Sequence, residues 1–163
     1  MSSYLALAIS VGVLAVVATW LFSSVDPVVA AQMQVWQAFI AWGCHYHSGG
    51  KIKGTTTTIL CMSFGAVVGM TAGWLIPQLS ALGQLDAPVA VGLGALVICL
   101  ASKLPFLGTI PASVYGFASI AGLFLLSPGM TPTGALLPTI LSIIVGAAFG
   151  YVSEAVAGAL GKK

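Results

Sequence analysis

The sequence predicts an all-α polytopic membrane protein, folded as one transmembrane domain over residues 1–163. Its composition is the first reason: hydrophobic residues reach 59%, charged residues only 5%, and the mean hydropathy is +1.10. Soluble domains carry roughly 25% charged residues, so this chain could not cover a water-facing surface. The other two reasons are the recurrence of long apolar runs and the distribution of the lysines along the chain.

The apolar runs predict the transmembrane helices in order, because crossing a bilayer takes roughly 20 apolar residues. Short connections rich in proline, glycine and serine separate these runs. Six spans are expected, at residues 4–22, 28–46, 55–76, 85–101, 104–126 and 134–160.

The lysines give an independent prediction of the topology. Lys51 and Lys53 follow the second expected span, Lys103 follows the fourth, and Lys162 and Lys163 follow the sixth. With six spans, every lysine falls on one side of the membrane, and the positive-inside rule assigns that side to the cytoplasm. Both termini are therefore expected to be cytoplasmic.

Glycines inside the third and sixth expected spans recur at four-residue steps, which places each set on one helix face. Such faces let two helix backbones approach closely, so we expect helix packing there. A glycine face that lines a narrow pore is the alternative. The residues are Gly65, Gly69 and Gly73 in the third span, and Gly146 and Gly150 in the sixth.

Pro111 falls several residues into the fifth expected span. A proline inside a helix removes one backbone donor and frees the carbonyl one turn earlier. In a membrane that carbonyl must find another partner, and Thr109 and Ser113 are close in sequence. We expect a kink at Pro111, with a broken helix as the alternative.

The second and fifth expected spans resemble each other weakly. The segments "AFIAWGCHY" and "SVYGFASIA" superpose with an offset of 75 residues, which sets Ala38 against Ser113. An offset of three spans gives two halves of opposite orientation, as in the inverted repeats of transport proteins. The matching residues are small or aromatic, so a chance similarity is the alternative to a 3+3 inverted repeat.

The string "WQAFIAWGCHYHSGGKIKG", a following glycine-rich span, and "FLGTIPASVYGFASIAG" together resemble the YcdZ-like family of bacterial inner-membrane proteins. The resemblance runs from about the first span to about Gly150. It implies a multi-pass protein of the bacterial inner membrane. Because this family is a domain of unknown function, it implies no mechanism, and the two histidines of "GCHYH" are not a hallmark of it.

The second expected span is amphipathic in an unusual way. On a helix of 3.6 residues per turn, one side carries the small and polar residues Gln34, Gln37, Ala38, Ala41, Cys44, His45 and Ser48. A second stripe carries Val35, Phe39, Trp42 and Tyr46. Polar side chains inside a bilayer rarely face lipid, so the polar side should face the bundle interior or an aqueous cavity.

The sequence offers titratable side chains but no metal or catalytic pattern. His45 and His47 are two residues apart, which places them on nearly opposite sides of a helix. We expect them to anchor the span at the headgroup boundary, with pore-mouth lining and a metal or catalytic role as alternatives. Glu154 is expected to be solvated or paired with Lys103, or else to act as a gate. No metal, no cofactor and no disulfide are expected, and the free cysteines behave as small apolar residues.

No charged residue is expected near the middle of the bilayer, although ion pumps and proton-driven carriers usually need one there. The chain also lacks the clusters typical of an enzyme and the positive charge typical of nucleic-acid binding. We therefore expect a facilitative channel or uniporter for a small neutral polar solute such as urea, a short amide or ammonia. Its candidate lining residues are Gln34, Gln37, Phe39, Trp42, Cys44, His45, Thr57, Thr58, Thr109, Ser113, Tyr115 and Phe117.

A structural or assembly subunit of the membrane, without transport activity, is the alternative hypothesis. The small-residue faces would then bind other copies or another membrane protein. Under either hypothesis the lipid bilayer is a partner, and a symmetric homo-oligomer, with a trimer as the guess, is expected.

Overall fold

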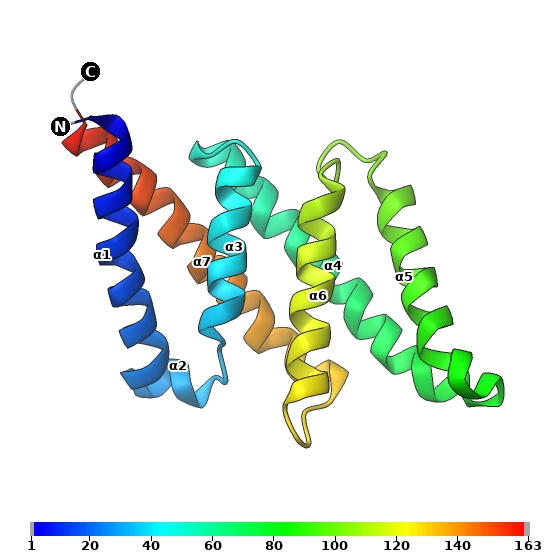
Figure 1. Ribbon diagram of the computed structural model, residues 1–163. Coiled ribbons are helices and arrows are strands. Elements are labelled where there is room, and N and C mark those ends of the chain that lie inside the picture. Colours follow the sequence, from blue (N-terminus) through cyan, green and yellow to red (C-terminus); the bar gives the residue numbers. More distant parts are fainter. Residues whose placement is uncertain (1, 162–163) are drawn as a thin grey trace.

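The computed structural model describes residues 2–161 and is entirely helical over that range. Seven α-helices and one short 3-10 segment follow one another along the chain (Figure 1). They are α1 (Ser3–Ser24), α2 (Asp26–Ala30), α3 (Val35–His47), α4 (Lys51–Gln78), η1 (Ser80–Leu85), α5 (Asp86–Ala101), α6 (Ile110–Leu126) and α7 (Pro132–Leu160).

Two long helices organise the bundle. In Figure 1, α1, α3, α6 and α5 stand upright in a row, while α4 and α7 cross them obliquely. Helix α4 packs most extensively against α6, and α7 against α3; α4 and α7 also pack against each other. The start of α1, the end of α7, and the α3–α4 and α5–α6 connections all lie at one end of the bundle (Figure 1). Lys51 is the first residue of α4, directly after the first of these connections, and Lys103 lies in the second.

Four expected spans coincide with helices α1, α4, α5 and α7, but the second and fifth do not run as expected. Residues 28–46 are divided between α2 and α3, and the chain turns between them at Gln32, which has a φ of +55°. The side-chain amide of Gln34 donates from Nε2 to the backbone carbonyl of Gln32 over 2.9 Å and so satisfies a group left free by the turn. Helix α3 is therefore only 13 residues long.

The kink expected at Pro111 is not found. Residues 104–109 form part of the connection between α5 and α6, and α6 begins at Ile110, so Pro111 occupies its first turn. A backbone N–H has no partner within the helix at that position, and the fixed φ of proline suits it. Pro111 therefore starts α6 instead of bending it.

Glycines allow the tightest contacts of the bundle. A β-carbon added at Gly65 would overlap the carbonyl oxygen of Ser113, and one at Gly146 would overlap that of Ala38. In the same way, Gly69 lies against Ile120 and Gly150 against His45. The backbones of α4 and α6, and those of α7 and α3, approach each other through these positions.

These contacts form two matching sets. The pairs Gly65–Ser113 and Gly69–Ile120 join α4 to α6, and the pairs Gly146–Ala38 and Gly150–His45 join α7 to α3. Ser113 and Ile120 each follow their counterparts Ala38 and His45 by 75 positions. Similarly, α5 packs on α4 as α1 packs on α7. Each long helix thus receives one short helix and one outer helix from the opposite half of the chain.

The outer surface is strongly apolar. Large side chains such as Val13, Val16 and Trp20 on α1, and Leu96 and Leu100 on α5, are exposed. Among the described residues, four helical segments are long and apolar enough to cross a membrane: Ser3–Ser24, Lys51–Gln78, Ser80–Ala101 and Pro132–Leu160. Helices α3 and α6 are apolar but shorter. The protein is an all-α protein suited to association with a membrane.

Candidate functional site

The polar side of α3 is its buried side. Its buried residues are Gln37, Ala38, Ala41, Trp42, Cys44 and His45. With the exception of Trp42, they belong to the small and polar side, which therefore faces the interior of the bundle. Buried polar side chains need partners, and those of α3 find them in two clusters near opposite ends of the helix.

The first cluster surrounds Gln37, which is fully buried. Its Nε2 donates to the carbonyl oxygen of Ser119 on α6 over 2.9 Å and to Oγ1 of Thr139 on α7 over 3.0 Å. Ser119 and Thr139 are fully buried as well. An amide from the first half of the chain is thus held by two helices of the second half.

This cluster is not fully hydrogen-bonded. Within residues 2–161, Oε1 of Gln37 and Oγ of Ser119 have no partner. A buried polar atom without a partner costs about 1–3 kcal/mol. The region around Gln37 therefore carries unused hydrogen-bonding capacity.

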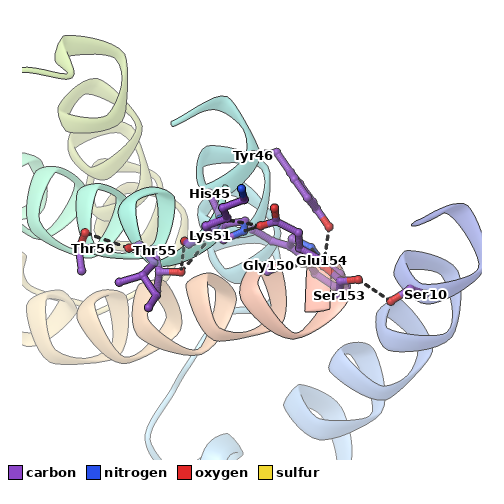
Figure 2. A network of polar contacts seen from close by, with 11 residues as sticks. Ser10, His45, Tyr46, Lys51, Thr55, Thr56, Gly150, Ser153 and Glu154 are labelled. Atoms are coloured by element: carbon purple, nitrogen blue, oxygen red, sulfur yellow. Dashed lines mark hydrogen bonds and ion pairs between the residues drawn. The ribbon is translucent and has the colours of Figure 1, made fainter. Parts of the chain in front are cut away.

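The second cluster surrounds His45, at the end of the bundle where α3 turns into α4 (Figure 2). The His45 side chain is fully buried, and its Nε2 lies 3.1 Å from Oε2 of Glu154 on α7. Its Nδ1 lies 3.2 Å from Oγ1 of Thr55 on α4. The same Glu154 oxygen accepts the backbone N–H of Lys51 over 2.6 Å. One carboxylate thus joins α3, α7 and the first turn of α4.

A sharp turn makes room for this carboxylate. Gly50 has a φ of +67°, and a β-carbon there would lie 2.7 Å from Oε2 of Glu154. Glycine adopts such a φ readily and presents no side chain to the carboxylate. Since an ionised carboxylate only accepts hydrogen bonds, Nε2 of His45 must carry the proton in this contact. The expected pairing of Glu154 with Lys103 is wrong, because His45 and the Lys51 backbone take that place.

Ser153 extends the second cluster toward α1. Its hydroxyl donates to the Gly150 carbonyl over 2.8 Å and lies 2.9 Å from Nε1 of Trp42 and 2.6 Å from the hydroxyl of Tyr46. The Ser153 proton is used toward Gly150, so Trp42 and Tyr46 act as donors to its oxygen. On α1, the hydroxyl of Ser10 donates to the Ser153 carbonyl over 2.8 Å (Figure 2).

A hollow of about 580 Å³ opens near the other end of α3. Gln34 and Val35 at the start of α3 line it together with Leu123 of α6. Gln34 precedes Gln37 by three residues, and Leu123 follows Ser119 by four, so the lining lies one helical turn from the first cluster. The hollow therefore lies about one helical turn from Gln37, while His45 lies about 12 Å beyond Gln37 along the helix.

The model of a family described as "Protein of unknown function (DUF1097)" matches residues 8–158. The chain belongs to this family. No curated protein matches the chain, and no solved structure matches it. In this DUF1097 protein the matched range includes both clusters, from Gln37 to Glu154.

The structure distributes the expected lining residues over different environments. Gln37, Trp42, Cys44, His45, Thr58 and Ser113 are buried, Gln34, Thr57, Thr109, Tyr115 and Phe117 are half-buried, and Phe39 is exposed. Of these, Gln37 and His45 centre the two clusters and Gln34 lines the hollow. His47 is separated from His45 and lies against Tyr115, with ring centres 6.0 Å apart. No cluster of three or more potential metal ligands occurs in the described part of the chain.

Ser119, Thr139 and Ser153 were not predicted from the sequence as members of a site. On α7 a helical period was there to be found, because Thr139, Ser142, Gly146, Gly150 and Ser153 recur at steps of three and four residues, and all five are buried. The pattern of glycines predicted only the packing positions on this face, and it did not include the hydroxyl groups beside them. Ser119 offers no comparable signal, since its carbonyl forms the contact to Gln37.

Proposed function

We propose that this DUF1097 protein is a facilitative uniporter for a small neutral polar solute in the bacterial inner membrane. The chain would cross the membrane six times, with α1, α3, α4, α5, α6 and α7, and both termini would be cytoplasmic. The alternating direction of these helices in Figure 1 supports six crossings. Lys51, at the start of α4, and Lys103, in the α5–α6 connection, lie at the same end of the bundle, in agreement with the positive-inside rule.

The two matching sets of contacts support a 3+3 inverted repeat. One repeat would comprise α1, α3 and α4, and the other α5, α6 and α7. In such transporters the solute site lies where the repeats meet, near the middle of the bilayer. Helix α3, with 13 residues, is about 20 Å long, so irregular chain at residues 31–34 would complete its crossing. That segment lines the hollow about one helical turn from Gln37, as expected of irregular backbone at membrane depth.

The observation that carries the proposal is the Gln37 cluster: a fully buried amide at the contact of the two halves, with unused hydrogen-bonding capacity. No Asp, Glu, Lys or Arg belongs to α3 or α6, which favours a neutral solute over an ion. The hydrogen-bonded His45–Glu154 pair closes one end of α3, and the hollow near Gln34 opens at the other end. This arrangement suits a carrier that is open toward one side of the membrane better than a channel that is open to both sides.

Purified protein in lipid vesicles tests the proposal. We expect protein-dependent uptake of urea, acetamide or ammonia, measured by stopped-flow light scattering against empty vesicles. The uptake should saturate with solute concentration, because a carrier passes through an occluded state. Equal rates with and without protein over the whole panel would overturn the proposal.

A structural membrane subunit is the second candidate. It is favoured by the complete burial of Gln37 within helix contacts, since polar contacts can hold membrane helices together. The same vesicles separate the two functions. A structural subunit leaves uptake at the level of empty vesicles, and replacing Gln37 then changes stability alone.

A further inference from the structure

We infer that Oε1 of Gln37 and Oγ of Ser119 form the binding site of a small neutral solute, which they recognise through its N–H or O–H donors. The inference rests on the proposed function and names the chemical class of its solute: ammonia, urea or a short primary amide, as opposed to molecules that only accept hydrogen bonds. Neither atom has a hydrogen-bond partner within residues 2–161.

The contacts of the Gln37 amide determine which of its atoms is free. An amide nitrogen and oxygen are difficult to distinguish by shape, so their assignment depends on their partners. Here the partner at 2.9 Å is the Ser119 carbonyl oxygen, which can only accept. The atom facing it must therefore be the NH₂ group. The opposite atom, Oε1, is an acceptor without a donor, and a solute that carries an N–H or O–H group would satisfy it.

The Ser119 hydroxyl supplies the second contact. A hydroxyl group both donates and accepts, so it can bind a carbonyl oxygen or an amine nitrogen on the same solute. The Gln37 amide is bonded to the backbone carbonyl of Ser119, so the residue that carries this hydroxyl is in direct contact with Gln37. Thr139 accepts from the same amide nitrogen over 3.0 Å and fixes the amide plane from α7.

The hollow gives this site a side of access. Its lining residues Gln34 and Val35 belong to the start of α3, and Leu123 lies one turn beyond Ser119 on α6. Leu123 is only 2% exposed and belongs to the lining, whereas Ser119 and Gln37 do not. A small displacement of α6 relative to α3 would connect the hollow to Gln37. A solute moving from Gln37 toward the other end of α3 would meet the hydrogen-bonded His45–Glu154 pair.

Three isomers of formula C₃H₇NO provide the test, because they differ mainly in the number of N–H donors. Propionamide has two, N-methylacetamide one and N,N-dimethylformamide none. We expect their affinities for the full chain in lipid nanodiscs, measured by saturation-transfer NMR, to fall in that order. Each lost donor should weaken binding about 2- to 10-fold. Equal affinities for the three isomers would overturn the inference.

Two variants connect the order of affinities to this site. Ser119→Ala should weaken binding of propionamide about 2- to 10-fold without lowering the melting temperature, because the Ser119 hydroxyl has no partner to lose. The control, Ser142→Ala, removes a hydroxyl that accepts the Gln34 N–H over 2.9 Å. It should lower the melting temperature and retain the order of affinities. If Ser119→Ala binds propionamide as tightly as the wild type, the inference is wrong.

The proposed function and this inference fail in different ways. Binding that depends on donors, without protein-dependent uptake in vesicles, leaves the site in place and removes the uniporter. Saturable uptake that ignores the number of donors, in the wild type and in Ser119→Ala alike, leaves the uniporter in place and removes the site.

Discussion

His45 and Ile120 occupy equivalent places in the two halves of the chain. Each belongs to a short helix, each is fully buried, and each packs on a glycine of the long helix of the other half, Gly150 or Gly69. Yet His45 binds a carboxylate and a threonine, whereas Ile120 belongs to the apolar core. The helix contacts repeat, and the chemistry placed on them does not.

The Gln37 cluster differs between the halves in the same way. Its equivalent position 75 residues later is Ala112, which has no amide. Thr58 is the equivalent of Thr139 on the other long helix, and its hydroxyl has no partner within the described residues. Small residues thus set the packing of both halves. The polar side chains of Gln37 and His45 belong to the first half, and Ala112 and Ile120 take their places in the second. Under the proposed function, this difference between the halves sets the Gln37 and His45 clusters apart from the shared packing.

The largest effect should come from the glycines that the two halves share. A β-carbon at Gly65 or Gly146 would overlap a backbone carbonyl of the facing helix, so the helices must separate. We expect Gly65→Ala and Gly146→Ala each to lower the free energy of unfolding by about 3 kcal/mol or more, measured by SDS titration in mixed micelles. Gly12→Ala is the control, because Gly12 has open space around it. A large loss in only one half would show that the two contacts are not equivalent.

The next effect tests the polar pair that distinguishes the halves. His45→Ile gives the first half the residue of the second, and it removes one hydrogen-bond partner from each of Thr55 and Glu154, which keep their contacts to the Lys51 backbone. We expect a loss of about 2 kcal/mol in the free energy of unfolding. Glu154→Ala should cost a similar amount.

The double variant should cost about 1 kcal/mol less than the sum of the two, because residues in one hydrogen-bonded network are coupled. Ile120→Val is the control in the other half, and its cost of about 1 kcal/mol should add to that of Glu154→Ala. Additive losses for His45 and Glu154 would mean that their contact contributes nothing to stability.

Sequence patterns predicted what depends on neighbouring residues. The helical period placed Gln37, Cys44 and His45 on one side of α3, and that side is buried. The same reasoning failed where a turn interrupts an apolar run, because hydropathy averaged over a run does not register the left-handed residue Gln32 or a first turn at Pro111.

Partners from distant parts of the chain were beyond the reach of these patterns. His45 and Glu154 are 109 residues apart, and nothing in the sequence around either residue identifies the other. Lys103 was the expected partner of Glu154 only because both were expected near the same membrane surface. The backbone N–H of Lys51 is a still harder partner to foresee, since every residue except proline has such a donor.

The smallest expected effect concerns the starts of the two short helices. Oγ of Ser142 accepts the Gln34 N–H at the start of α3, and the thiol of Cys61 donates to the carbonyl oxygen of Phe106 over 3.6 Å, in the connection that precedes α6. Each long helix thus places one small polar side chain against the backbone that precedes the short helix packed on it, Ser142 as an acceptor and Cys61 as a donor. We expect Cys61→Ser and Ser142→Cys, which exchange the two side chains, each to change the free energy of unfolding by less than about 1 kcal/mol. Ser142→Val should cost more than Ser142→Cys, because it leaves the Gln34 N–H without an acceptor. Equal losses for these two variants, measured in the same mixed micelles, would show that this contact does not stabilise the start of α3.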